Sequence, residues 1–224
     1  MILAIIPARI GSKGVPQKNL RQIAGKPLVK WTIDAVQNSK LVDNSVLSSD
    51  DNHILTLARA KTTMHDRTPA FATDQASLES VVHDVLSSDD VFEQVEVILL
   101  LQPTSPIRTG EQIDAAIRQL WDDGADSLVS VVKTHSFIWQ VSNGIAHADY
   151  IFKARPRRQS IDAKWEENGS IYAFTKEHWE KHHNRLGGKV TLFEMPEETR
   201  IQIDTELDFQ IVEKLLEREK VLVH

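Results

Sequence analysis

The chain has 224 residues, of which 41% are hydrophobic and 26% are charged, so it can form one substantial core and fits a single α/β domain. Lys and Arg number 26 against 32 Asp and Glu, and the net charge of -6 argues against the basic surface that nucleic-acid binding requires. The absence of cysteine excludes disulfides and thiolate metal sites and is compatible with a reducing compartment.

The apolar run at the N-terminus is short. It extends from Ile2 to Ile6 before Pro7 and Arg9, which is too short for the core of a signal peptide. No later stretch reaches the length of a bilayer helix. We therefore expect a cytoplasmic protein with small-molecule partners, which binds neither nucleic acid nor a membrane.

Four apolar runs predict strands in the first 132 residues. The runs at 2–6 and 95–101 are continuous and bounded by loops, and shorter ones occur at 45–48 and 127–132. Runs of this kind are typical of strands that are buried on both faces of a parallel sheet.

Helical patterns lie between these strands. Apolar residues recur at spacings of three and four within 28–36, 78–86 and 113–120, and Thr109 with Gln112 forms a capping box before the third helix. The alternation of strand and helix predicts an open α/β sheet, with its ligand site at the carboxyl ends of the strands.

The alternation stops at residues 134–165. This stretch has little helical periodicity, contains Asn143-Gly144, which favours a hairpin turn, and ends in the basic segment KARPRRQ. We interpret it as an arm inserted in a single domain that spans 1–224.

Regular structure returns after the arm. The patterns at 170–174 and 190–193 predict strands, and a final helix is expected to begin near Thr205. That helix carries three apolar residues at fourfold spacing, namely Leu207, Ile211 and Leu215.

The loop PARIGSKGVPQKN follows the first strand. Gly11 and Gly14 can turn backbone N–H groups toward an anion, and Arg9, Lys13 and Lys18 can neutralise its charge. The spacing matches neither the Walker motif nor GxGxxG. A polyphosphate site and a solvated basic loop both remain open from this pattern alone.

The segment LLLQPTSPIR follows another buried strand. Two prolines fix the backbone around Thr104 and Ser105, and Gln102 lies where the strand ends, at the edge where such sheets bind ligands. The alternative is a stiff turn that leads into the next helix, which explains the prolines but not the polar Gln102.

Carboxylates close two predicted strands. Asp204, next to Thr205 and near Asp208, can cap the final helix or bind Mg²⁺ between protein and phosphate. Asp50 and Asp51 have the same two interpretations.

A pair of histidines lies one helical turn apart. The spacing of His178 and His182 can bind a transition metal. Because no third ligand accompanies them in the pattern, a histidine-rich surface helix is the favoured interpretation.

Taken in order, these segments resemble the acylneuraminate cytidylyltransferase family, also called the CMP-sialic acid synthetases. The resemblance covers nearly the whole chain, from residue 2 to about residue 209. Its segments are IIPARIGSKGVPQKNL, GKPLVKWTIDA, SSDD, RTPAFATDQAS, LLLQPTSPIRTG, ENGSIY and IDTELDF.

The resemblance implies a Rossmann-like nucleotidyltransferase fold, with a mostly parallel sheet, helices on both faces and a small β-rich arm through which family members usually form homodimers. It implies that CTP and an acidic keto-sugar give a CMP-sugar and pyrophosphate, with Mg²⁺ required. The anomeric hydroxyl would attack the α-phosphorus directly, so that the protein supplies mainly positioning and positive charge.

The resemblance also assigns roles to residues. The triphosphate and cytidine would be bound by Arg9, Gly11, Ser12, Lys13, Lys18, Asn19, Arg67, Asp74, Ala76 and Ser77. Lys18, Arg9 and Asp204 would be catalytic, and Asp204 would bind the metal. Gln102, Arg158 and Asn168 would face the sugar.

Two positions depart from the family pattern. Gln202 stands where members commonly have Asp, which predicts weaker metal binding, and Glu166 stands where they commonly have Arg, which predicts repulsion of the sugar's carboxylate. Lys164 or Arg157 can compensate, or the sugar differs from N-acetylneuraminate. The alternatives are an enzyme that acts on the eight-carbon acid Kdo and a catalytically impaired paralogue that only binds nucleotide.

Overall fold

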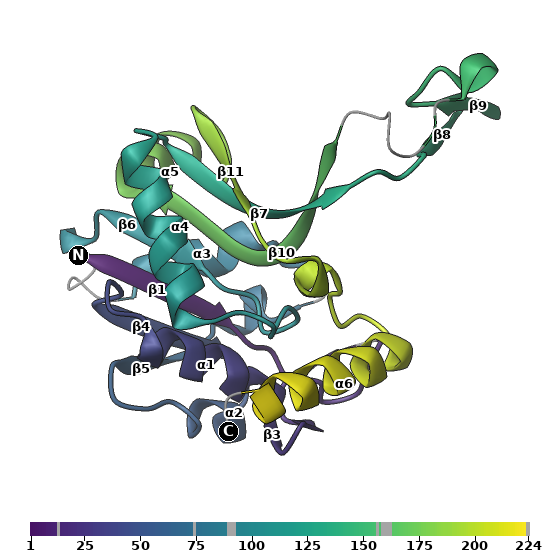
Figure 1. The fold of residues 1–224 in the computed structure, drawn as a ribbon. Coiled ribbons are helices and arrows are strands. Elements are labelled where there is room, and N and C mark those ends of the chain that lie inside the picture. Colours follow the sequence, from purple (N-terminus) through teal and green to yellow (C-terminus); the bar gives the residue numbers. More distant parts are fainter. Residues whose placement is uncertain (13, 74, 89–92, 156, 158–162, 223–224) are drawn as a thin grey trace.

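A seven-stranded sheet forms the centre of the computed structural model, which describes residues 1–12, 14–73, 75–88, 93–155, 157 and 163–222 (Figure 1). The strand order is β11-β7-β10-β6-β1-β4-β5. The strands are β1 (Ile2–Pro7), β4 (Asn44–Ser49), β5 (Thr62–Asp66), β6 (Val97–Leu100), β7 (Ser127–Thr134), β10 (Lys164–Thr175) and β11 (Val190–Glu194). Three predicted site residues, Lys13, Asp74 and Arg158, lie outside the described residues.

Most neighbouring strands are parallel. β1 pairs in parallel with β4 and β6, β4 with β5, and β7 with β11. β10 is antiparallel to both of its neighbours, β6 and β7, and has an irregular register between Glu167 and Tyr172. The prediction of an open, mostly parallel sheet is therefore confirmed.

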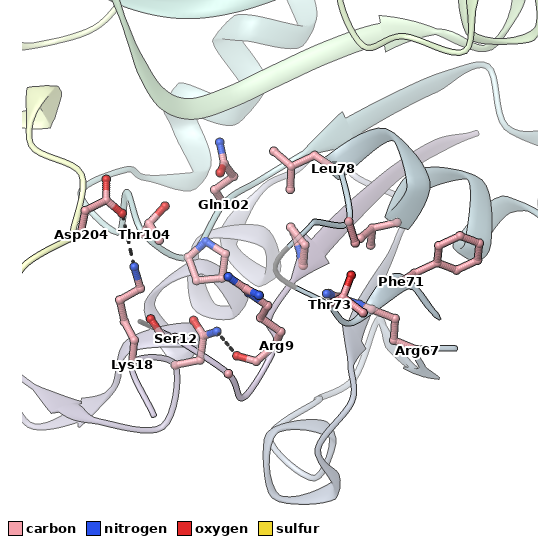
Figure 2. A pocket seen from close by; sticks show the side chains of 16 residues that line it. Arg9, Ser12, Lys18, Arg67, Phe71, Thr73, Leu78, Gln102, Thr104 and Asp204 are labelled. Atoms are coloured by element: carbon pink, nitrogen blue, oxygen red, sulfur yellow. Dashed lines mark hydrogen bonds and ion pairs between the residues drawn. The ribbon is translucent and has the colours of Figure 1, made fainter. Parts of the chain in front are cut away.

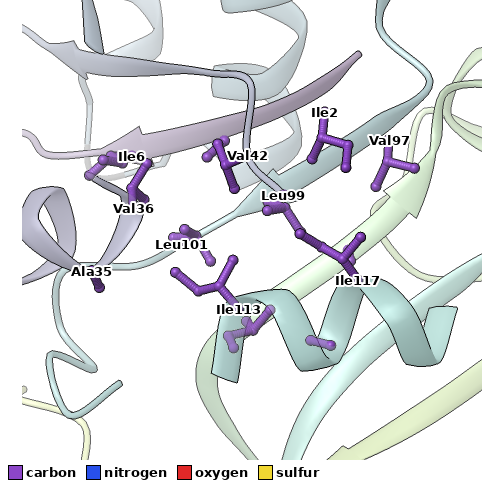
Figure 3. Packing of buried hydrophobic residues seen from close by; sticks show 14 of the residues in the cluster. Ile2, Ile6, Ala35, Val36, Val42, Val97, Leu99, Leu101, Ile113 and Ile117 are labelled. Atoms are coloured by element: carbon purple, nitrogen blue, oxygen red, sulfur yellow. The ribbon is translucent and has the colours of Figure 1, made fainter. Parts of the chain in front are cut away.

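Helices cover both faces of the sheet, as predicted. α1 and α4 pack Val36, Ile113 and Ile117 on one face against Leu99 and Leu101 (Figure 3). α3 and α5 cover the other face. The capping box is present, with Gln112 N donating to Thr109 Oγ1 at 3.3 Å. The helices are α1 (Leu28–Asn38), α2 (Asn52–Leu55), α3 (Leu78–Leu86), α4 (Gly110–Asp122), α5 (Lys176–His182) and α6 (Glu206–Leu222), with short 3-10 turns η1 (Pro69–Phe71), η3 (Phe152–Ala154) and η5 (Glu197–Arg200).

Of the three residues at fourfold spacing in the C-terminal helix α6, Leu215 packs against the body, whereas Leu207 and Ile211 are exposed. Phe209, Val212 and Leu216 pack into a third apolar cluster around the short hairpin of β2 (Gln22–Ile23) and β3 (Lys26–Pro27). Leu207 remains 64% exposed, because the helix has two apolar faces and only one meets this cluster.

Among the described residues, no helix combines the length and the apolar composition needed to cross a bilayer.

The inserted segment projects from the body of the molecule (Figure 1). It contains a hairpin of β8 (Trp139–Ser142) and β9 (Ile145–Ala148). Asn143 and Gly144 form its turn with φ of 52° and 75°, as predicted from the Asn-Gly pair. Within the arm, Phe137 and Tyr150 pack edge-on, with their ring centroids 4.6 Å apart.

Candidate active site

One pocket opens at the carboxyl ends of β1 and β6, where the sheet topology predicts a ligand site (Figure 2). Residues from four separate segments line it: the loop after β1, the region from Arg67 to Val81, the loop after β6 and the segment before α6. The lining residues are Pro7, Arg9, Gly11, Ser12, Lys18, Asn19, Arg67, Phe71, Thr73, Ala76, Leu78, Val81, Gln102, Pro103, Thr104 and Asp204.

Lys18 joins the first loop to the segment before α6. Its ammonium donates to the carbonyl oxygen of Ile203 and lies 3.5 Å from the carboxylate of Asp204, across the pocket in Figure 2. The Lys18 side chain is 10% exposed and that of Asp204 is 74% exposed. Burial lowers the pKa of Lys18, and the charge of Asp204 partly opposes that effect.

The first loop approaches this segment closely. A Cβ added at Gly14 would lie 1.8 Å from the carbonyl oxygen of Asp204, so glycine is the residue that lets the two backbones meet. Asn19 donates to the carbonyl oxygen of Arg9 at 2.8 Å, and Asp50 accepts from the backbone N–H of Ile10 at 2.9 Å. These contacts hold the backbone of the loop for which the sequence resemblance predicts triphosphate binding.

Arg67 is anchored at the end of β4. Its guanidinium donates to the carbonyl oxygen of Ser48 at 2.7 Å and to the Ser48 hydroxyl at 3.1 Å, which also lies 3.0 Å from His65. Burial lowers the pKa of Arg67 to about 10, and Asp50 and Asp84 oppose this effect. Arg67 therefore remains a cation at neutral pH.

The charge of the pocket suits an anion. Among the described lining residues, Arg9, Lys18 and Arg67 are cationic and Asp204 is the carboxylate. No group of three metal-ligating side chains occurs in the described part of the chain. Mg²⁺ commonly binds to one or two carboxylates and to substrate phosphates, so the exposed carboxylate of Asp204 fits an ion that is shared with a polyphosphate.

Asp204 is not a helix cap, which excludes one of its two interpretations. Asp208 accepts from the backbone N–H groups of Asp204 and Thr205 at 3.1 and 2.8 Å, and the hydroxyl of Thr205 accepts from Asp208 N at 3.2 Å. The carboxylate of Asp204 is therefore left to the pocket. Asp51, in contrast, caps α2 through a 3.1 Å contact with Ile54 N.

Gln202 contacts β10. A Cβ added at Gly169 would lie 2.3 Å from the amide oxygen of Gln202, so this side chain packs against the glycine backbone. Gln102 donates to the carbonyl oxygen of the same Gly169 at 3.2 Å. Both amides therefore meet β10 at its irregular register.

Two predicted residues do not line the pocket. Ser77 caps α3 by accepting from Ser80 N at 3.1 Å. Asn168 is fully buried, and its amide contacts the hydroxyl groups of Ser130 at 2.6 Å and Thr199 at 2.8 Å. The contact of Asn168 with the sugar stays a prediction, whereas the geometry gives this residue a structural task in β10.

Arg108 is a residue that sequence reasoning missed. It is 6% exposed, and its guanidinium donates to the carbonyl oxygens of Gln102 and Ser170 and to the hydroxyl of Thr32 at 2.7 Å. Burial lowers its pKa to about 9. The one sequence signal was a charged residue inside the otherwise uncharged segment QPTSPIR. Arg108 positions the loop that carries Gln102.

Glu166 is paired rather than free to repel a substrate. It forms an ion pair with Arg200, which also contacts the carboxylate of Glu197 and donates to the carbonyl oxygen of Lys133 at 2.8 Å. The negative charge of Glu166 is thus partly offset by Arg200, and the repulsion of a substrate carboxylate stays a prediction. Lys164, which the sequence offered as a compensating cation, pairs with Asp149 in the arm instead.

The Glu166–Arg200 pair should show a favourable coupling energy in a double-mutant cycle. Glu166→Arg places two guanidinium groups together, and because Glu166 is 52% exposed we expect a loss of only about 1 kcal/mol in unfolding free energy. Glu166→Arg/Arg200→Glu should recover only part of it, because Arg200→Glu also removes the contacts with Glu197 and with the carbonyl oxygen of Lys133. Urea denaturation of a double-mutant cycle measures this, and additive losses in the double variant would contradict the pairing.

The histidine pair is only half on the surface. His178 is 4% exposed, whereas His182 is exposed, and their ring centroids are 4.8 Å apart. The interpretation as a surface helix is therefore wrong for His178, because its ring packs against Gly187.

Comparison with known proteins identifies relatives over the whole chain. The sequence model of the cytidylyltransferase family matches residues 3–222. N-acylneuraminate cytidylyltransferase B of Danio rerio is 32% identical over 219 residues, which are 94% of this chain and 50% of that protein. The chain thus spans about half the length of the first curated relatives that it matches.

Another relative has nearly the same length. Post-translational flagellin modification protein B of Campylobacter coli is 29% identical, over 98% of this chain and 97% of that protein. Among solved structures, CMP:2-keto-3-deoxy-manno-octonic acid synthetase complexed with CTP superposes with a TM-score of 0.70, over 97% of this chain and 99% of that one. Its sequence identity is 18%, so this likeness supports the fold alone.

Proposed function

We propose, because this chain belongs to the cytidylyltransferase family, that it transfers the cytidylyl group of CTP to the anomeric hydroxyl of a sialic-type nonulosonic acid. The observation that carries the proposal is the pocket in which Arg9, Lys18 and Arg67 face Asp204. Curated relatives at 32 and 33% identity are N-acylneuraminate cytidylyltransferases, which supports the choice of acid.

The reaction needs positioning more than covalent chemistry. An oxygen–phosphorus bond forms between the sugar and the α-phosphate, the bond to the β-phosphate breaks, and pyrophosphate leaves with the electron pair. Charge develops on the phosphate oxygens, where fixed cations are most effective. Arg9 and Lys18 lie in the loop that meets the segment before α6 at Gly14, and the carbonyl oxygen of Ile203 holds the Lys18 ammonium in place before substrate binds.

Asp204 is the residue that would hold Mg²⁺. Its exposed carboxylate is not used for capping, and phosphate oxygens would complete the coordination. The bound ion would neutralise charge on the triphosphate and its leaving group. Gln202 packs against Gly169, so we assign no metal contact to it.

The deciding experiment measures pyrophosphate release from CTP with Mg²⁺ across sialic, legionaminic, pseudaminic and octulosonic acids. We expect turnover with a nine-carbon acid, and loss of that turnover when EDTA removes the metal. Turnover restricted to the octulosonic acid would establish the Kdo alternative instead. CTP binding without turnover on any acid would establish the impaired paralogue, and turnover with another nucleotide only would refute the proposal.

We also propose that the arm joins two copies of this chain. Residues 138–152 expose a group of large apolar side chains away from the body, namely Ile138, Trp139, Val141, Ile145, Ile151 and Phe152. Apolar side chains gathered on a projecting segment favour contact with another protein surface. Homodimerisation through such an arm is the expectation drawn from the family resemblance.

A charge on one face of the hairpin tests the dimer. Val141 is 72% exposed and lies on the same hairpin face as Trp139, so Val141→Glu should weaken association at least about 10-fold without unfolding the chain. Gln94→Glu adds one charge at an exposed position outside the arm and should leave the dimer intact. Light scattering after gel filtration measures the mass. A monomeric wild-type chain, or a Val141→Glu variant that remains dimeric, would contradict the proposal.

A further inference from the structure

A charged cluster lies beyond Gln102 on the face of the sheet that α3 covers. It consists of Glu79, Glu167, Tyr172 and Arg185, here called the Arg185 cluster. Tyr172 is directly opposite Leu100 in the β10–β6 pairing, so these two side chains lie on one face, and Gln102 follows Leu100 by two residues, just beyond the end of β6. Glu79 directly follows Leu78, which lines the pocket with Gln102 (Figure 2).

The contacts within the cluster hold Arg185 in place. Its guanidinium pairs with the carboxylate of Glu79 and lies 4.7 Å from the ring centroid of Tyr172. The hydroxyl of Tyr172 donates to Glu167 at 3.0 Å. The Arg185 and Glu79 side chains are each 24% exposed, so the pair is neither buried core nor free surface.

This placement of Arg185 is costly. The Nε atom of Arg185 is buried and has no hydrogen-bond partner among the described residues. A buried donor without a partner is uncommon and calls for an explanation by strain or function. Arg185 keeps this position next to α3 although one of its donors is unsatisfied, and we interpret its partly exposed guanidinium as a contact for a ligand.

The charge of the cluster restricts which ligand group fits. Burial and the charge of Glu167 raise the pKa of Tyr172 to about 12, so the phenol is neutral. The cluster then holds two carboxylates and one guanidinium, and its net negative charge disfavours an anion. A neutral group that can both accept from Arg185 and donate to Glu167 fits instead, and an amide has both capacities.

We infer, resting on the proposed function, that Arg185 is a specificity-determining residue that binds an acylamino substituent of the sugar acid. The guanidinium donates to the carbonyl oxygen of the substituent, and Glu167 accepts from its N–H. Glu79 and Tyr172 are positioning residues for Arg185. The sugar's own carboxylate is directed away from this cluster, toward the cations of the nucleotide pocket.

The test compares an acylamino acid with its analogue that has a hydroxyl in place of the acylamino group. For Arg185→Met we expect kcat/KM for the acylamino acid to fall about 10- to 100-fold, mainly through the KM for the acid. For the hydroxyl analogue the fall should be less than about threefold, with the KM for CTP unchanged. Arg118→Met, on the exposed side of α4, is the control for loss of an arginine.

Several results would overturn the inference. Equal losses for both acids, or no loss, with an unchanged melting temperature would remove Arg185 from substrate recognition. If Arg185→Met unfolds the chain, Arg185→Lys keeps the charge and stem, and it must show the same selective loss in smaller measure. Wild-type turnover of only amide-free acids would refute the inference while the cytidylyltransferase proposal stands. Failure of the proposed function would appear separately, as no pyrophosphate release from CTP by the wild-type chain with any of the acids.

Discussion

Lys18→Ala is expected to lower kcat about 10³-fold, with a much smaller effect on CTP binding. The side chain is 10% exposed and held between the carbonyl oxygen of Ile203 and the carboxylate of Asp204, so its charge is fixed where the phosphates would lie. A fixed cation in a water-poor site stabilises developing charge more than a mobile one does, because it needs no reorganisation. Steady-state kinetics and CTP titration measure the two effects.

The pH dependence separates the charge of Lys18 from its packing. Burial lowers the pKa of Lys18, so its proton is lost at a lower pH than that of an ordinary lysine, and activity should fall as the pH rises through that lowered pKa. Lys18→Arg keeps the charge to much higher pH, and the alkaline fall due to this group should disappear. Lys30→Ala, which removes a partner of Asp34 outside the pocket, is the control. Retention of a tenth or more of kcat in Lys18→Ala would exclude a catalytic role.

The central sheet could be predicted from the sequence because strands buried on both faces leave continuous apolar runs. Residues 2–6 and 95–101 became β1 and β6 for this reason. The direction of β10 could not be predicted in the same way. A buried strand at 170–174 has the same apolar pattern whether its neighbours are parallel or antiparallel, and only the pairing with Leu100 and Val129 sets its direction.

The face of α6 that is buried could not be predicted from the sequence pattern either. The spacing of Leu207 and Ile211 is as helical as that of Phe209, Val212 and Leu216, so periodicity alone cannot rank the two faces. Burial is decided by the position of the β2–β3 hairpin, which Phe209 meets. The exposed stripe is therefore a consequence of tertiary packing that local sequence does not encode.

Residues of the candidate site could be predicted from the sequence where one short segment holds several of them. Contacts between residues far apart in the sequence could not. The cations of the first loop follow directly from their spacing around Gly11 and Gly14. The partner of Glu166 is 34 residues away, and that of Arg185 is 106 residues away. The role of Asp204 was ambiguous because Asp204, Thr205 and Asp208 can each cap the final helix. Only the hydrogen bonds of the structure show that Thr205 and Asp208 form the cap.

Arg108→Met should be the most destabilising single change in the site region, at about 3 to 5 kcal/mol of unfolding free energy. The side chain is 6% exposed and supplies donors to the carbonyl oxygens of Gln102 and Ser170. Met fills a similar space but leaves both oxygens buried without a donor. For a chain of this size the loss corresponds to a fall of roughly 10 °C in melting temperature.

A graded series distinguishes this explanation from a simple loss of packing. Thr32→Val removes one partner of Arg108, which lies 2.7 Å away, and should cost only about 1 to 2 kcal/mol. Arg108→Lys keeps the charge but cannot reach Gln102, Ser170 and Thr32 at once, so it should lie between the two. The same variants should be tested by denaturation, for stability, and by steady-state kinetics with the sugar acid, for substrate binding. Both quantities should change because Arg108 donates to the backbone carbonyl oxygen of Gln102. Arg108→Lys should therefore raise the KM for the acid even where the fold survives. An Arg108→Met chain as stable as the wild type would show that the carbonyl oxygens of Gln102 and Ser170 do not depend on Arg108.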